Sequence, residues 1–192
     1  MPFLRVATCK TSLGHTSQDA HALLAQVYAR ECGAPMPPLC RTSRGKPYLE
    51  DSSLEISISH TNRLAFCALS DHPVGLDAED SERAVRPSVQ KRVLSSEEQA
   101  FLAAVPDPDR VFLRFWTLKE AYVKFTGTGL GRFPSDLSFS LLEDGTAQLA
   151  GSGLFFKTEW FLGHTVSLCS DVFLPFQPEF LRISPVFYQK TP

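Results

Sequence analysis

Twice in this sequence, a segment with the apolar spacing of a helix is followed by three short runs typical of strands. The helices are predicted over residues 17–32 and 109–125, and a glycine follows each as a natural C-terminal stop. The strand-like runs are predicted at residues 54–59, 64–69 and 74–79, and then at 136–142, 154–161 and 164–169. This repeated order favours an α+β fold of two similar halves, which we divide into residues 1–75 and 76–192.

The composition limits what the protein can do. The 192 residues are 43% hydrophobic, which is ample for a buried core, and the net charge of -2 is spread along the chain, unlike the clustered Lys and Arg of a nucleic-acid-binding protein. No run approaches the roughly 20 apolar residues of a membrane span, and the first residues lack an export signal, so we expect a soluble protein. Five scattered cysteines argue against disulfides and a zinc site, and favour the cytoplasm.

Two acidic residues share one face of the strand predicted at residues 74–79 (VGLDAE). Strand alternation places Asp77 and Glu79 on the side of Gly75, and the apolar residues on the opposite side. Neighbouring carboxylates repel each other, and a hard divalent cation with oxygen ligands would make the arrangement favourable. A solvated sheet face is the alternative, because water screens such repulsion.

The second predicted helix carries Glu120 and Lys124 on one face, four residues apart, with Trp116 one turn earlier and Lys119 beside them. A pair at this spacing is usually an ion pair on a helix surface. This helix is largely apolar, however, and a charge on a buried helix needs a partner or a cation. Both interpretations remain open on the spacing alone.

Two further residues suit anion binding. His60 ends an Ile-Ser-Ile-Ser alternation, and because it faces away from its neighbour Ser59, the two cannot easily form a nucleophile and base pair. A histidine at a strand end can contact an anion or cap a turn. Lys46, held before a proline, can bind a phosphate as an isolated cation or be an ordinary exposed lysine. The glycine run at residues 127–131 follows a helix, so it is not a dinucleotide fingerprint.

The remaining segments give weaker indications. Residues 81–94 contain four basic side chains, which could dock an acidic partner protein or form a solvated face. Ser95 and Glu98 have the spacing of a capping box, which predicts a short helix before the second long one. The proline-containing tail at residues 173–192 is predicted to be extended chain on the surface.

Four stretches taken together carry a family resemblance. They are residues 45–49 (GKPYL), 56–60 (ISISH), 74–79 (VGLDAE) and 115–124 (FWTLKEAYVK). Their order and spacing resemble the surfactin-synthetase type of 4′-phosphopantetheinyl transferase, over roughly residues 17–142. The resemblance implies a monomer of two pseudo-symmetric lobes, each a helix on a small, mostly antiparallel sheet, with coenzyme A in the cleft between them. The related single-lobe type, which trimerises, is shorter than this chain.

The resemblance also implies a reaction and a set of site residues. The enzyme would transfer the phosphopantetheine group of coenzyme A to a serine of an apo acyl, aryl or peptidyl carrier protein, with Mg²⁺, and release 3′,5′-ADP. The implied metal ligands are Asp77, Glu79 and Glu120. The implied coenzyme A contacts are Lys46, Ser59, His60, Lys119 and Lys124, of which the two helix lysines would meet the pyrophosphate in catalysis. Glu120 would also accept the proton of the serine.

The sequence departs from the family pattern in two places. Thr61 and Asn62 stand where Ser-His-Ser-Gly is common, and Arg5 and Lys10 are the only basic residues before the first predicted helix. Two alternatives therefore accompany the transferase hypothesis. One is a metal-dependent phosphohydrolase, in which the three carboxylates activate water, and the other is a non-catalytic coenzyme A-binding homologue.

Overall fold

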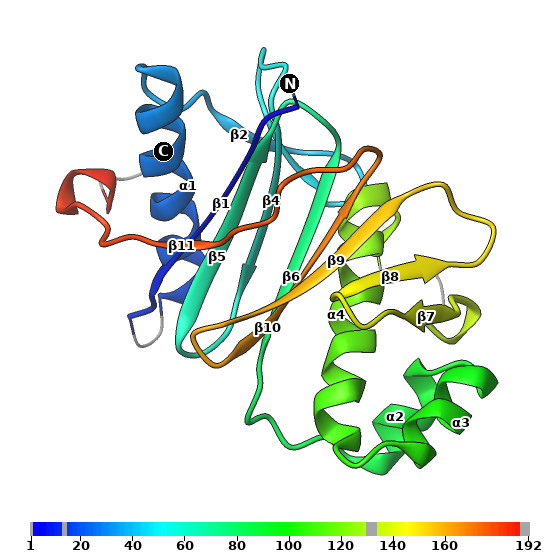
Figure 1. The fold of residues 1–192 in the computed structure, drawn as a ribbon. Coiled ribbons are helices and arrows are strands. Elements are labelled where there is room, and N and C mark those ends of the chain that lie inside the picture. Colours follow the sequence, from blue (N-terminus) through cyan, green and yellow to red (C-terminus); the bar gives the residue numbers. More distant parts are fainter. Residues whose placement is uncertain (1, 13–14, 130–133, 189–192) are drawn as a thin grey trace.

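Two sheets lie at the centre of the molecule, and each packs against one long helix (Figure 1). The computed structural model describes residues 2–12, 15–129 and 134–188. The end of the predicted extended tail, at residues 189–192, and the end of the glycine run at 127–131 lie outside these ranges. The α+β class predicted from the sequence is confirmed.

The first sheet has the strand order β11-β1-β5-β4. Its strands are β1 (Leu4–Lys10), β4 (Glu55–His60), β5 (Leu64–Ser70) and β11 (Glu179–Phe180). The pairs β1–β5 and β4–β5 are antiparallel, whereas β11 runs parallel to β1. A separate hairpin joins β2 (Leu39–Arg41) to β3 (Pro47–Leu49).

The second sheet has the order β6-β10-β9-β8-β7 and is antiparallel throughout. Its strands are β6 (Val74–Asp80), β7 (Phe139–Leu141), β8 (Thr146–Leu149), β9 (Phe155–Phe161) and β10 (His164–Ser170). Both sheets are thus mostly antiparallel, as the sequence predicted.

The helices are α1 (Thr16–Cys32), α2 (Pro87–Val93), α3 (Ser96–Ala104) and α4 (Pro108–Thr126). Two single 3-10 turns are η2 (Pro134–Asp136) and η3 (Pro185–Tyr188). Gly33 and Gly127 end the two long helices in the left-handed conformation, where glycine has no Cβ penalty. The capping box predicted at Ser95 and Glu98 begins α3.

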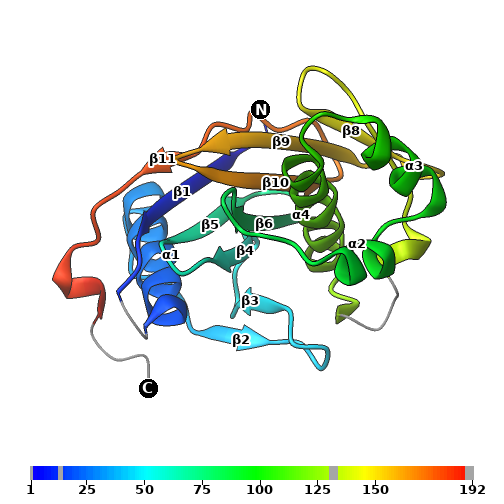
Figure 2. The same ribbon diagram turned by 90° about the horizontal axis from the view of Figure 1, so that it is seen from below.

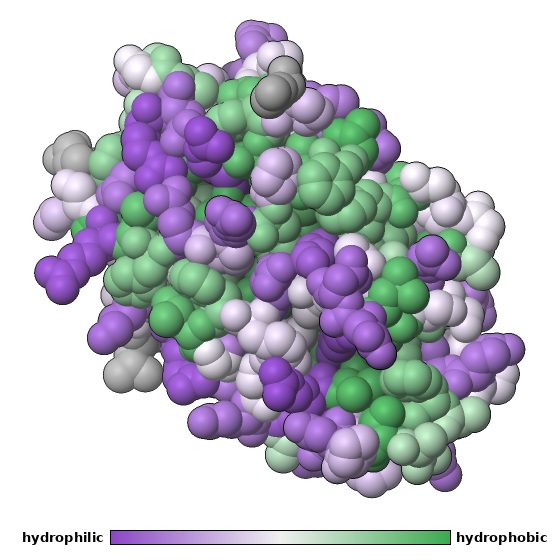
Figure 3. All heavy atoms as spheres, in the orientation of Figure 1, coloured by the Kyte–Doolittle hydropathy of each residue, from purple (hydrophilic) through white to green (hydrophobic). Residues whose placement is uncertain are grey.

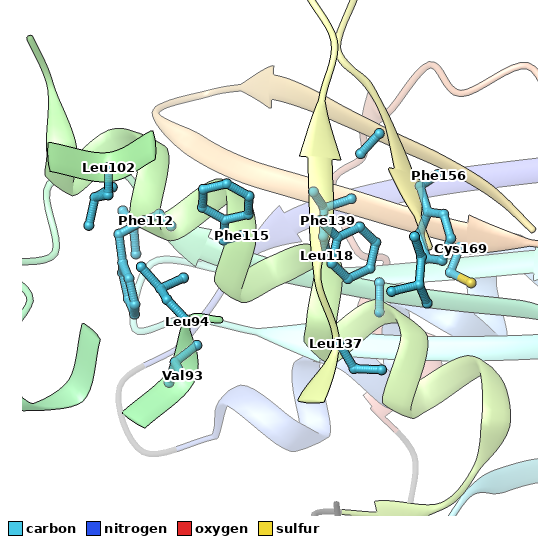
Figure 4. Close-up of a cluster of buried hydrophobic side chains, with 14 residues drawn as sticks. Val93, Leu94, Leu102, Phe112, Phe115, Leu118, Leu137, Phe139, Phe156 and Cys169 are labelled. Carbon is cyan, nitrogen blue, oxygen red and sulfur yellow. The ribbon is translucent and has the colours of Figure 1, made fainter. Parts of the chain in front are cut away.

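Three buried apolar clusters hold these elements together. One lies between α1 and the first sheet, and one between α4, the two short helices and the second sheet. Figure 4 shows the latter, which contains Phe115 of α4; the rings of Phe139 of β7 and Phe156 of β9 lie 4.9 Å apart in it, measured between their centroids. The third cluster joins β1 and β5 of the first sheet to β6 and β10 of the second, with Phe176 of the tail.

Strand alternation explains why each sheet contributes to two clusters. On β5, Phe66 enters the cluster shared by both sheets, whereas its neighbour Cys67 faces α1. A strand buried on both faces is an almost continuous apolar run, and all seven residues of β5 are buried.

The structure differs from the predicted elements mainly in the short ones. The chain begins with a strand, β1, so the first half does not start with a helix as predicted. The strand predicted at 136–142 covers only β7, because η2 occupies its start. The turn after β7 leads to β8, which was not predicted, and the tail adds β11 to the first sheet.

Figure 3 shows hydrophilic and hydrophobic residues interspersed over one face of the molecule. In the described part of the chain, no helix combines the length and the apolar character that a membrane crossing requires.

Candidate active site

The edge strands of the two sheets, β4 and β6, meet through serine hydroxyls. Ser57 Oγ accepts a hydrogen bond from the Leu76 amide at 2.8 Å, and Ser59 Oγ accepts one from the Ala78 amide at 3.2 Å. Ser59 Oγ also donates to Asp77 Oδ1 at 2.9 Å. Backbone donors of β6 are thereby satisfied, and Asp77 is fixed relative to β4.

On β6 the predicted alternation is confirmed. Val74, Leu76 and Ala78 lie in the cluster between the sheets. Gly75 faces α4, and a Cβ at this position would lie 2.0 Å from Ala121 O and 2.5 Å from Phe125 N. The backbone of α4 can therefore rest directly on β6, which brings the helix side chains to the acidic face of the strand.

Asp77 is buried and forms an ion pair with α4. Its Oδ1 atom accepts a hydrogen bond from Lys124 Nζ at 2.7 Å. The same ammonium donates to Ile58 O at 3.1 Å. Lys124 therefore bridges the edge strands of both sheets from the helix that covers their junction.

Glu79 lies two residues farther along β6 and is held from two sides. Trp116 Nε1 donates to Glu79 Oε1 at 2.9 Å, and the Arg83 guanidinium pairs with the same oxygen. The indole comes from α4, one helical turn before Glu120. Both carboxylates of β6 thus face the same stretch of α4.

Glu120 completes the acidic group. Burial raises its pKa to about 7; the negative charge of Asp77 and, more weakly, that of Glu79 act in the same direction, and Lys124 opposes them. The three carboxylates are therefore close enough to interact electrostatically. Over residues 2–12, 15–129 and 134–188, no three Asp, Glu, His or Cys side chains are already in chelating geometry.

Lys46 lies at the C-terminal end of α4. Its Nζ donates to Phe125 O at 2.9 Å and lies 3.7 Å from Glu55 Oε2. A cation at this end of a helix is favoured by the helix dipole. Lys46 and Lys124 also line a pocket of about 250 Å³ between the β2–β3 hairpin, β4 and α4. Two of the predicted phosphate contacts therefore share one pocket.

The other predicted residues lie at different distances from this group. Ser59 lies between β4 and β6, where it contacts Asp77, and His60 is exposed at the end of β4. Lys119 points away from the pocket: it is 1% exposed, pairs with Glu98 and donates to Val93 O at 2.7 Å. Its ammonium is thus enclosed by the ends of α2 and α3, because residue 119 faces a side of α4 different from that of Glu120.

Sequence reasoning missed several residues around the site. Arg41 and Arg44 line the same pocket as Lys46, and Ser57 joins the edge strands. Both arginines lie just before the Gly-Lys-Pro stretch at residues 45–47, so the basic character of this segment was readable in the sequence. The role of Ser57 was not, because it depends on which strands become neighbours in three dimensions.

A family model described as the 4′-phosphopantetheinyl transferase superfamily matches residues 73–173, which include β6, α4 and all three carboxylates. The chain belongs to this superfamily. The resemblance found in the four sequence stretches is thereby confirmed.

Several proteins of this superfamily are similar to the chain. The 4′-phosphopantetheinyl transferase HetI of Nostoc sp. is 38% identical over 102 residues, which cover 47% of this chain and 41% of HetI. The 4′-phosphopantetheinyl transferase Sfp of Bacillus subtilis is 28% identical over 134 residues, covering 66% of this chain and 59% of Sfp. The chain spans about half the length of the curated relatives it matches.

Among solved structures, the holo-[acyl-carrier-protein] synthase of Thermotoga maritima matches with a TM-score of 0.45 and 24% identity. The match covers 51% of this chain and 61% of that protein. A likeness this partial says nothing about the activity.

Proposed function

We propose that this protein transfers the 4′-phosphopantetheine group of coenzyme A to a serine of an apo acyl, aryl or peptidyl carrier protein, in a magnesium-dependent reaction that releases 3′,5′-ADP. The observation that carries the proposal is the gathering of Asp77, Glu79 and Glu120 where β4, β6 and α4 meet, with Lys124 and Lys46 beside them. Phosphoryl transfer needs positioning and charge neutralisation more than a covalent protein nucleophile, and this group of residues offers both.

The proposed molecule is a monomer of two pseudo-symmetric lobes, residues 1–75 and 76–192, with the active site between them. The pairing of α1 with the first sheet and of α4 with the second supports this division. The boundary falls inside β6 (Val74–Asp80), after its second residue. The C-terminal tail does not follow this division. Its strand β11 joins the first sheet, so this part of the tail packs with the first lobe.

The donor set fits Mg²⁺, which prefers hard oxygen ligands and is usually held by a few carboxylates together with substrate phosphates. Asp77, Glu79 and Glu120 would hold it; burial raises the pKa of Glu120 most, and the repulsion from Asp77 and Glu79 that adds to this shift would be relieved by a cation. The bound metal would neutralise charge on the pyrophosphate of coenzyme A.

The pocket residues would bind the rest of the substrate. Lys124 and Lys46 would contact phosphate oxygens, and Ser59 and His60 would lie along the adenosine phosphates. Lys119 is not part of the proposed set, since its ammonium is buried against Glu98. This differs from what the resemblance implied for it.

Glu120 would act as the general base. The pKa of Glu120 is about 7 in the metal-free site, and a bound Mg²⁺ would lower it, so Glu120 would be ionised and able to accept a proton at neutral pH. The serine oxygen of the carrier attacks the phosphorus nearest the pantetheine, its proton passes to Glu120 directly or through water, and 3′,5′-ADP leaves with the electrons of the broken P–O bond.

The test is incubation of the protein with coenzyme A, Mg²⁺ and a panel of apo carrier proteins, followed by intact mass measurement. We expect one carrier serine to gain a phosphopantetheine group, and we expect EDTA or Asp77→Asn to abolish the gain. Release of 3′,5′-ADP without modified carrier would indicate the phosphohydrolase instead. Binding of coenzyme A with neither product would indicate a non-catalytic homologue.

A further inference from the structure

A buried hydroxyl group under α4 has no hydrogen-bond partner among the residues that the structure describes. It belongs to Thr165 of β10, whose side chain is fully buried. Val166 and Leu168 of this strand lie in the cluster between the sheets, so Thr165 faces the opposite side. That side of β6 and β10 is covered by α4 (Figure 2). Because buried polar groups are normally paired, the unpaired hydroxyl of Thr165 calls for a functional explanation.

Thr165 stands directly opposite Glu79, one of the three carboxylates of the site. The antiparallel register of β6 and β10 pairs these two residues, just as it pairs Asp77 with Ser167. Side chains in such positions share a face, with Cβ atoms about 4.5–5.5 Å apart. The hydroxyl of Thr165 can therefore reach the Glu79 carboxylate by rotation of the two side chains alone.

One oxygen of the Glu79 carboxylate is available to accept this hydrogen bond. Trp116 and Arg83 both donate to Oε1. Within residues 2–12, 15–129 and 134–188, no group donates to Oε2. An unpaired donor and a carboxylate oxygen with free acceptor capacity thus lie next to each other on neighbouring strands.

The other buried hydroxyls under α4 differ from that of Thr165. Ser167 Oγ lies 2.7 Å from Thr117 Oγ1 of α4 and 2.9 Å from Thr158 Oγ1 of β9. Thr117 Oγ1 also donates to Leu113 O at 2.9 Å. Burial under the helix therefore does not by itself leave a hydroxyl unpaired. Of these four described hydroxyls, the exception is the one beside Glu79.

We propose that Thr165 is a positioning residue for Glu79: its hydroxyl donates to Oε2 and orients the carboxylate once Glu79 holds the cation. The inference rests on the proposed function, because it concerns the Mg²⁺ ion assigned to Glu79. Thr165 acts through Glu79 and touches neither the metal nor the substrate. Hydrogen-bond partners of this kind orient metal ligands, and their loss typically lowers metal affinity about 10- to 100-fold.

The test measures Mg²⁺ affinity by calorimetry, without carrier protein, for Thr165→Val and Thr165→Ser. Thr165→Val removes the hydroxyl and nearly keeps the shape, so we expect a loss of affinity of about tenfold or more. Thr165→Ser keeps the hydroxyl and is expected to stay within about threefold of the unmodified protein. In the transfer reaction, the KM for Mg²⁺ rises in Thr165→Val, whereas the KM for coenzyme A does not change.

Urea unfolding separates this role from a purely structural one. Thr165→Val is expected to keep or raise the unfolding midpoint, because the hydroxyl that it removes is buried and unpaired. The matched control is Thr158→Val, which removes a paired hydroxyl under the same helix. It is expected to lower the midpoint and to leave Mg²⁺ affinity unchanged. Metal affinity and stability therefore respond oppositely to the two substitutions.

The inference is overturned if Thr165→Val binds Mg²⁺ as tightly as the unmodified protein, or if Thr158→Val loses as much affinity. If Thr165→Val fails to fold, Thr165→Ser decides: an affinity about tenfold lower despite the retained hydroxyl also overturns it. Normal transfer with a KM for Mg²⁺ that does not depend on Thr165 rejects this role alone. Transfer to no carrier, with Mg²⁺ affinity still dependent on the Thr165 hydroxyl, rejects the proposed function and supports the positioning role.

Discussion

The backbone of α4 lies so close to β6 that only a hydrogen atom fits at the Cα of Gly75. Gly75→Ala would place a Cβ 2.0 Å from Ala121 O, and a backbone atom cannot rotate away as a side chain does. We expect a loss of about 3 kcal/mol in the free energy of unfolding, at the upper end of overpacking effects. Urea unfolding followed by circular dichroism measures it.

The matched control is Gly153→Ala, because a Cβ at Gly153 would have no neighbour within 4 Å. This variant is expected to stay within about 0.5 kcal/mol of the original protein. Equal stability of the two variants would contradict the close packing of α4 on β6.

The raised pKa of Glu120 predicts how metal binding depends on pH. With a pKa of about 7, Glu120 is mostly protonated at pH 6 and mostly ionised at pH 8. Because a metal ligand must be deprotonated, the proposed role of Glu120 as a ligand predicts that Mg²⁺ affinity falls roughly tenfold from pH 8 to pH 6. Calorimetric titration of the nucleotide-free protein gives the affinity at each pH.

The proposed roles of the Glu120 carboxylate also predict how Glu120→Gln changes Mg²⁺ affinity and the rate of transfer. If Glu120 holds Mg²⁺ and acts as the base as proposed, this variant is expected to bind Mg²⁺ more weakly, with an affinity that no longer changes between pH 6 and pH 8. Its rate of transfer is expected to fall about a hundredfold or more, while coenzyme A still binds. A pH dependence that survives in Glu120→Gln would mean that another group titrates. Unchanged transfer would remove Glu120 from the proposed role of base.

Among single residues, the sequence predicts the placements that local periodicity determines. Strand alternation is enough to place Asp77 and Glu79 on one face, and helical spacing is enough to place Glu120 with Lys124. The ion-pair partner of Lys119 could not be predicted from local periodicity. Glu98 was recognised only as a capping residue, and its contact with Lys119 depends on how α3 packs against α4.

The buried pair Lys119–Glu98 holds several elements together. Glu98 accepts hydrogen bonds from the Ser95 amide at 2.9 Å and the Phe139 amide at 2.8 Å, and Lys119 donates to the carbonyl of Val93. The pair thereby joins α4 to the end of α2, the start of α3 and β7. Burial lowers the pKa of Lys119, and its ion pair with Glu98 opposes that shift.

Lys119→Met is expected to destabilise the protein by about 3–5 kcal/mol, because it leaves the Glu98 carboxylate buried without its cation. Adding Glu98→Gln removes that charge and keeps the amide acceptor, so the double variant is expected to recover part of the loss. Urea unfolding of the single and double variants measures the coupling. If the double variant loses the sum of both single effects, the two side chains do not act as a pair.

Among the elements, length decides much of what the sequence could reveal; the exception is β1 (Leu4–Lys10), which has seven residues but no regular alternation of buried and exposed positions and was not predicted. The long helices and the strands β4, β5, β6, β9 and β10 have enough residues for their periods to be recognised. The strands β2, β3, β8 and β11 have two to four residues, too few for a period, and are strands because of their neighbours. Arg41 and Arg44 lie on the hairpin of β2 and β3, and the sequence did not show that this hairpin lies against the end of α4, so their place in the pocket was missed.

For the whole molecule, the proposed lobes share one core. The cluster between the sheets takes Leu4 and Phe66 from the first, Leu76 and Val166 from the second, and Phe176 from the tail. Separation of the halves would expose these residues on both sides, and β11 would leave the edge of β1. Buried apolar area of this kind makes two halves unfold as one.

We therefore expect a single, two-state thermal transition by calorimetry, with the van't Hoff enthalpy equal to the calorimetric enthalpy. Expressed separately, residues 1–75 and 76–192 are expected to lack cooperative unfolding and to regain structure when mixed. Two resolved transitions, or a fragment of residues 1–75 with a cooperative transition of its own, would show that the lobes are independent domains. A site built from residues of both lobes benefits from this coupling, because Lys46 of the first lobe and Lys124 of the second then keep a fixed separation.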